Sequence, residues 1–392
     1  MSSVRKDLKA CIRHFTPSWH TVVMGTGSVS GLFSHFYIGQ DTQAIKALTL
    51  LFFFLNLGFF VLICSATIAR YALYPKVPMV RDAATPSAKS LHGRVSYGRG
   101  NTHKYCGRCA PEMAMGRYGI PVGLVGILVV GFRGVIRDGR WNALRNDGDH
   151  QHSLQAMSPL WLLPVVTLIV ASSTGGIVAA AFPGHQSVVA LTTAVSFTML
   201  AMGLSVALMM ITVYLMRCII HGPLDTGIIL SSFVVLGPLG QGGFSLLQNS
   251  ANLSLIDLGP LITASSIQGA CLCAAWVLFS MGIIWLCIAV MVIGNTLVQK
   301  RIPFSVGYWG MIFPNGVFAL LAVQLGVVLD SKVMSYIGVV LSIGVFLLWV
   351  FVVTKTIPAI WNTTVFHSPC VAKYDEENAA LESKPSTDAG LP

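Results

Sequence analysis

The segment Leu236-Gly-Pro-Leu-Gly-Gln-Gly-Gly243 places one proline and four glycines inside an otherwise apolar stretch of the chain. Proline removes a helix hydrogen bond and glycine weakens a helix, so both are unusual in a regular one. In a membrane they are tolerated where the freed backbone groups line a cavity or meet a neighbour. Three further apolar stretches share the pattern of an early proline followed by glycines: Pro17 with Met24-Gly-Thr-Gly27, Pro164 with Thr174-Gly-Gly176, and Pro314-Asn-Gly316.

The prolines of these stretches follow a period. Pro164, Pro238 and Pro314 are spaced by 74 and 76 residues, and Pro17 precedes Pro164 by 147 residues, almost two such intervals. A fixed period indicates a repeated supersecondary unit. We predict five hairpins, each pairing a helix interrupted by proline and glycine with a plainer hydrophobic helix.

The composition is that of a membrane protein. Charged residues make up 10% of the 392 positions and apolar residues 54%, whereas soluble domains carry about 25% charged residues. Uncharged runs are long enough to cross a bilayer as helices, which takes about 20 apolar residues. We predict an all-α polytopic membrane protein with eight clear spans: Trp19–Tyr37, Ala47–Ala69, Ser158–Phe182, Ser187–Met216, Thr226–Gln248, Ala264–Gly294, Phe304–Leu329 and Val333–Thr354.

The short loops alternate in charge. Lysine and arginine follow the second, fourth and sixth spans, and the intervening loops hold hardly any. The positive-inside rule then places both termini in the cytoplasm. We divide the chain into a cytoplasmic N-terminus (1–18), a first hairpin (19–75), three further hairpins (153–361) and a disordered, acidic cytoplasmic tail (362–392). Because the basic residues flank spans or lie in one segment, the net charge of +10 does not indicate nucleic-acid binding.

Residues 76–152 depart from the repeat. A second hairpin should begin near position 91, but the segment is basic and rich in glycine and arginine. Its one apolar run, Ile120–Phe132, is shorter than a normal span, and a lone crossing there would invert every later loop. Either this hairpin is lost, or the reading frame or an intron is misassigned. We favour misassignment, because period and topology resume in register afterwards.

The interrupted helices suggest how a small anion could be bound. Free backbone amides at the start of a helix present positive potential without a formal charge. The candidate anion pathway consists of Gly25, Thr26, Gly27, Pro164, Gly240, Gln241, Gly242, Phe244 and Pro314. The alternative is that the glycines only let helices pack closely. Recurrence at matching positions in four spans favours a pore, which Phe244 or Phe313 could plug.

Other site types find little support. The span cores hold no Asp, Glu, Lys or Arg, and no catalytic constellation is present, so we do not predict an enzyme. The run His103-Lys-Tyr-Cys106-Gly-Arg-Cys109 matches only half a zinc site, so neither a metal nor another cofactor is expected. Asn252-Leu-Ser254 would face outside, which makes Asn252 a candidate N-glycosylation acceptor.

Two motifs resemble a known family. Arg13-His-Phe-Thr-Pro-Ser-Trp19 followed by Met24-Gly-Thr-Gly27 resembles the opening of the tellurite-resistance/dicarboxylate transporter family. Gly237-Pro-Leu-Gly-Gln-Gly-Gly-Phe244 is similar to the fungal sulfite efflux pumps of that family. The resemblance covers Arg13–Tyr74 and Gln151 to about Trp361. It implies ten helices in five hairpins around a central pore, as in the related plant slow anion channels, and assembly as trimers.

The resemblance also implies a gate and a function. In this family a phenylalanine of the ninth helix occludes the pore, and Tyr308-Trp-Gly-Met-Ile-Phe-Pro-Asn315 matches that helix, so Phe313 is the gate candidate. We predict efflux of sulfite or a related small anion across the plasma membrane, without a prosthetic group. The alternatives are transport of malate or another C4-dicarboxylate and, in a different class, a non-transporting scaffold or an inactive gene product. Without its second hairpin, a five-sided pore would lack a wall.

Overall fold

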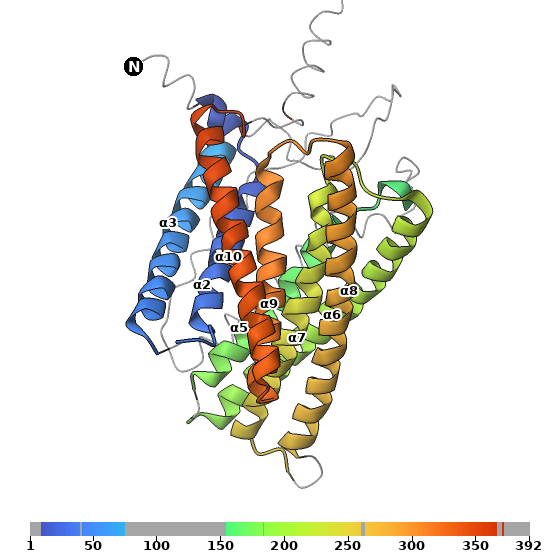
Figure 1. Cartoon of the computed structure of the whole chain (residues 1–392). Coiled ribbons are helices and arrows are strands. Elements are labelled where there is room, and N and C mark those ends of the chain that lie inside the picture. The colour runs from blue at the N-terminus through green and yellow to red at the C-terminus, as the bar shows by residue number, and fades with distance from the viewer. Residues whose placement is uncertain are drawn as a thin grey trace, which may run out of the picture.

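A computed structural model describes residues 9–39, 41–74, 154–182, 184–259, 263–366 and 371. Every regular element within these residues is a helix, which confirms the predicted all-α fold (Figure 1). The predicted degenerate hairpin at 76–152 lies outside the described residues, as do 1–8 and most of 362–392. The division into those segments therefore stays a prediction.

Each of the eight predicted spans corresponds to a helix. Seven helical stretches of the described chain, taken with their leading turns, are long and apolar enough to cross a membrane. The exception is the first, whose α-helix has 15 residues. The helices are α2 (His20–Ser34), α3 (Gln43–Leu73), α5 (Leu163–Ala180), α6 (Gln186–His221), α7 (Leu236–Ala251), α8 (Ala264–Gln299), α9 (Ile312–Val328) and α10 (Lys332–Trp361).

The prolines of the repeat start helices rather than interrupt them. Helices α2, α5, α7 and α9 each follow directly on a 3₁₀ turn: η1 (Pro17–Trp19), η4 (Pro159–Leu162), η5 (Ile229–Val235) and η7 (Val306–Met311). Pro164 is the second residue of α5, and Pro238 and Pro314 are the third residues of α7 and α9. Proline is tolerated in the first turn because an amide there lacks a partner one turn back within the α-helix. The glycines that follow therefore lie within uninterrupted α-helices.

The four helices with 3₁₀ starts form the inside of the bundle. Helix α2 packs on α9, α9 on α7, and α7 on α5, and each of the four also pairs with the helix that follows it in the chain. Helices α2 and α5 share no extensive contact. The described inner helices therefore form an open arc in the order α2, α9, α7, α5. A fifth inner helix of the predicted ring would come from the chain between α3 and α5, outside the described residues.

The outer helices face the surroundings with apolar side chains. Helices α3, α6, α8 and α10 are each 30 to 36 residues long. Large exposed side chains on them include Phe54, Leu62, Met209 and Ile284. Such continuous apolar exposure suits contact with lipid tails, and α3 and α6 lie at opposite sides of the bundle (Figure 1).

Both ends of the described bundle meet at one face. The ring of Trp19, just before α2, stacks on that of Phe366, just after α10, with centroids 5.4 Å apart. The start of α2 and the end of α10 consequently lie together (Figure 1). The predicted placement of both termini on one side of the membrane requires this arrangement, and the cytoplasmic assignment stays a prediction.

Two buried arginines hold the hairpins closed at the same face. Near the end of α3, Nε of Arg70 donates to the carbonyl of Arg13 at 3.3 Å. Near the end of α6, Arg217 donates to the carbonyl of Gln155 from Nε at 3.4 Å and from Nη2 at 3.3 Å, and from Nη1 to the carbonyl of Gly222. Each arginine thereby fixes the segment that leads into the first helix of its own hairpin. A charged donor also suits a helix C-terminus.

Candidate functional site

Helix α9 occupies the middle of the arc and touches two inner helices. A Cβ atom on Gly25 of α2 would lie 3.1 Å from Cβ of Ile312, and one on Gly240 of α7 would lie 2.7 Å from Cα of Phe318. With about 3.6 residues per turn, a third face of α9 lies between these two contacts. This face carries Phe313, Val317, Leu320 and Gln324.

Helix α2 contacts three helices and leaves one face open. Thr26 faces α10, where Nε1 of Trp349 donates to its hydroxyl at 3.1 Å. Gly27 faces α3, where a Cβ atom would lie 2.9 Å from Nδ2 of Asn56. The remaining face, on the side of the arc that α9 also presents, carries Met24, Gly31 and His35.

Helix α7 is buried on nearly every side. Nε2 of Gln241 donates to the hydroxyl of Ser173 on α5, and a Cβ atom on Gly242 would lie 3.0 Å from Cδ1 of Leu204 on α6. The face between α9 and α5 carries Phe244 and Gln248. We call the surface formed by this face and those of α9 and α2 the concave face: Met24, Gly31, His35, Phe244, Gln248, Phe313, Val317, Leu320 and Gln324.

The concave face is mostly apolar and holds no Asp, Glu, Lys or Arg. Helices α2, α5, α7 and α9 contain no Asp, Glu, Lys or Arg. Its polar side chains are His35, Gln248 and Gln324. Within the described part of the chain, no group of His, Cys, Asp or Glu side chains could hold a metal ion. An anion on this surface would therefore be held by neutral donors and by an imidazole, as in pores that replace hydration with dipoles.

The predicted gate residue lies on this surface. Phe313 is half-buried, between Ile312 and Pro314, which are both buried. Gly25 is opposite Ile312, so Phe313 lies within one helical turn of Met24 of α2, which is 37% exposed. An aromatic ring at the inner end of α9 is well placed to narrow a passage, and its gating role stays a prediction.

A second aromatic ring of the concave face contacts a histidine. Phe244 is 4% exposed, and the ring of His35 meets it edge to face, with centroids 6.0 Å apart and planes at 87°. His35 is not among the site residues predicted from the sequence. The signal that finds it is its helical spacing with Met24 and Gly31, which places the three on one face.

Most of the predicted pathway glycines lie against neighbouring helices. A side chain at Gly240 would meet the backbone of α9, whereas one at Gly25, Gly242 or Gly27 would press on the side chains of Ile312, Leu204 and Asn56, respectively. Thr26 is fully buried, and its hydroxyl accepts a hydrogen bond from Nε1 of Trp349. These positions carry the close packing of the arc. Direct contact between them and an anion stays a prediction.

A buried polar ladder joins α5 to α7. Beyond Gln241 and Ser173, the hydroxyls of Ser172 and Ser245 are 2.8 Å apart, and Nδ2 of Asn249 donates to the carbonyl of Ser172 at 3.3 Å. In lipid such groups gain little from water, so pairing across the interface fixes how the two helices align. Gln241, a predicted pathway residue, is used in this ladder.

Three further predicted residues have structural positions. Pro164 and Pro314 lie in the first turns of α5 and α9. Asn252 is 2% exposed, and its Nδ2 donates to the carbonyl of Gly176 at 2.8 Å. This nitrogen is buried and bonded in the folded chain, and glycosylation of Asn252 stays a prediction.

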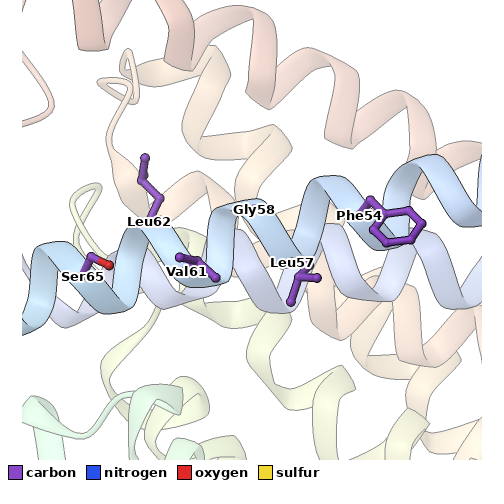
Figure 2. Close-up of a pocket in the computed structure, with 6 residues that line it drawn as sticks. All are labelled: Phe54, Leu57, Gly58, Val61, Leu62 and Ser65. Atoms are coloured by element: carbon purple, nitrogen blue, oxygen red, sulfur yellow. The ribbon is translucent and has the colours of Figure 1, made fainter.

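A shallow groove lies away from the concave face, along α3. Figure 2 shows the residues that line it, all from this one helix: Phe54, Leu57, Gly58, Val61, Leu62 and Ser65. Phe54 and Leu62 are more than half exposed. The groove has no charged residue and lies on the outer surface of the bundle, so it suits lipid rather than an anion.

The fold is that of a polytopic helical membrane protein, with seven helical stretches of the described chain suited to cross a membrane. The chain belongs to the voltage-dependent anion channel (SLAC1) family, whose model matches residues 14–357. This match confirms the family resemblance carried by the two sequence motifs.

Known relatives of the chain are transporters. It is 27% identical over 367 residues to the sulfite efflux pump SSU1 of Arthroderma otae. The alignment covers 90% of this chain and 92% of that protein. It is 23% identical over 363 residues to an uncharacterized transporter of Methanocaldococcus jannaschii, covering 92% and 98% of the two chains. The malic acid transport protein of Schizosaccharomyces pombe is 23% identical over 261 residues, or 61% of this chain and 54% of that protein.

Proposed function

We propose that this protein exports sulfite, or a related small anion, across the plasma membrane along the concave face. The observation that carries the proposal is the uncharged surface of the inner helices in a chain of an anion-channel family. A small anion can exchange part of its hydration shell for amide and imidazole donors at His35, Gln248 and Gln324.

The charge distribution favours sulfite over malate. A dicarboxylate carries two separated negative charges, and carriers of multivalent anions often place arginine in the membrane. Arg70 and Arg217 are both bonded to backbone carbonyls at the bundle face where the termini meet. Singly charged hydrogensulfite needs no fixed positive charge within the span. The sulfite efflux relatives support this choice, and the malic acid transport protein supports transport of malate as the second candidate.

Release of anions from loaded vesicles tests the proposal. The full-length chain is reconstituted into vesicles loaded with sulfite or with malate, and efflux is followed against empty vesicles. We expect sulfite release well above background. Release of malate alone would overturn the sulfite assignment, and release of neither would favour a non-transporting scaffold or an inactive product.

The gate variant Phe313→Ala should raise sulfite release, because removal of the ring widens the narrow end of the passage. The matched control is Phe60→Ala on α3, whose ring is 49% exposed on the outer surface. An equal effect of both changes would place the gate elsewhere. The trimer that the family resemblance implies stays a prediction.

A further inference from the structure

We infer that His35 and Phe244 form a second closure of the anion pathway, in series with the one at Phe313. The inference rests on the proposed pathway along the concave face. It assigns a role to two side chains that meet from helices distant in the sequence. Their rings form the edge-to-face contact described above, with centroids 6.0 Å apart.

The contact crosses in front of α9. Helices α2 and α7 each pack on α9 and have no extensive contact with each other. A Cβ atom on Gly31 of α2 would lie 3.7 Å from Leu320, and one on Gly243 of α7 would lie 2.6 Å from Leu321. His35 lies four positions beyond Gly31 and Phe244 lies one position beyond Gly243, so both side chains start within about one turn of the same level of α9. A ring pair that spans two non-neighbouring inner helices lies across the concave face.

His35 is held in place by the end of its own helix. Its Nδ1 lies 3.0 Å from the carbonyl of Gly31. A carbonyl oxygen only accepts, so this contact is a hydrogen bond when Nδ1 carries the proton. The ring is then anchored on one side, and its opposite edge is directed away from α2. Phe244, 4% exposed on the well-packed α7, gives it a fixed surface to close against.

The second closure is well separated from the first. Gly240 is opposite Phe318, so the same register places Phe244 opposite a residue near 322. That is nine positions beyond Phe313, or about 13 Å along the axis at 1.5 Å per residue. Val317 and Leu320 lie between the two levels on α9. Along the proposed pathway, two apolar side chains therefore separate the two aromatic levels.

His35 also gives the second closure a chemical character that Phe313 lacks. It is the one ionisable side chain on the concave face as defined from the described residues. An imidazole can donate a hydrogen bond to a passing anion and gains a positive charge when protonated. With Nδ1–H bonded to Gly31, Nε2 of the neutral ring only accepts, so the ring offers an anion a donor at its free edge when it is protonated.

Two closures in series predict a specific pattern of flux. If they resist passage about equally, removing either one lowers the total resistance by half, so flux rises about twofold at most. Removing both should raise it far beyond the product of the single effects. A single closure at Phe313 predicts instead that a change at Phe244 adds nothing.

The experiment measures chloride and sulfite currents of the full-length chain in planar bilayers. The variants are Phe313→Ala, Phe244→Ala and the double variant, with Phe60→Ala as control. We expect the current of each single variant to be at most about twofold that of the unsubstituted chain. The current of the double variant should be about ten-fold or more. A double variant whose current is no larger than that of Phe313→Ala would overturn the second closure. The inference would also be overturned if none of the variants carried current with either anion.

Further variants and the choice of anion separate the possible failures. Phe244→Leu preserves most of the packing volume on α7, and His35→Ala leaves α7 intact, so either can replace Phe244→Ala if that variant does not fold. Combined with Phe313→Ala, each of these two variants should give a large increase in current. If neither combination does so, the inference is overturned. If the chloride currents follow the expected pattern but no variant carries sulfite current, the proposed substrate is refuted and the second closure stays supported.

Discussion

Replacing Gly240 with alanine should push α7 and α9 apart. A Cβ atom at this position would lie 2.6 Å from the amide nitrogen of Phe318, 2.7 Å from its Cα and 2.8 Å from the carbonyl carbon of Val317. All three are backbone atoms, which cannot rotate away as a side chain can. An ordinary contact begins at 3.4 Å, so α9 would have to move back by about 0.8 Å.

The cost of this shift can be set against the intrinsic preference of alanine for helices. Overpacking a well-packed interface costs about 1–3 kcal/mol, and alanine is favoured over glycine in a helix interior by about 1 kcal/mol. Gly240→Ala should therefore lower the free energy of unfolding by about 0–2 kcal/mol. The matched control is Gly344→Ala in α10, where no atom outside its own helix lies within 4 Å. That variant should be neutral or slightly stabilising.

The assay is unfolding of the purified chain by titration with a denaturing detergent, followed by circular dichroism. Anion release from vesicles is measured on the same samples. Equal stability of Gly240→Ala and Gly344→Ala would refute the close approach of α7 and α9. A Gly240→Ala chain of normal stability but with altered anion release would instead show that this glycine acts on the anion.

Three other changes test buried polar contacts, each measured by the same unfolding titration. Arg217→Met should cost about 2 kcal/mol, because the carbonyl of Gln155 loses a charged donor; an unchanged stability would show that the hairpin closes without it. Thr26→Val should cost about 1–3 kcal/mol by leaving Nε1 of Trp349 unpaired, and Trp349→Phe should make the same change less harmful, which a double-mutant cycle detects as coupling. Asn249→Ala should cost about 1–3 kcal/mol by removing the amide that bonds to α5 and to its own helix; a neutral result would show that the ladder does not align the helices.

The sequence alone determined that the chain is a helical membrane protein and where its helices lie. A bilayer leaves few ways to satisfy backbone groups, so length and apolarity suffice to locate a helix. The predicted spans Ala47–Ala69 and Val333–Thr354 fall within α3 and α10, which extend farther at both ends. The period of the prolines also identified the helices of the arc, because each hairpin repeats the same start.

Only the tertiary structure decided what each face of those helices does. In a soluble helix, polar and apolar sides indicate which face is buried, but the inner helices here are apolar or neutral all round, so their sequence has no such contrast. Gly240 looks like an opening in a helix and is a contact between two backbones. Thr26 faces an outer helix, and His35 reaches Phe244 across α9. These contacts depend on the crossing of helices far apart in the chain, which local sequence does not specify.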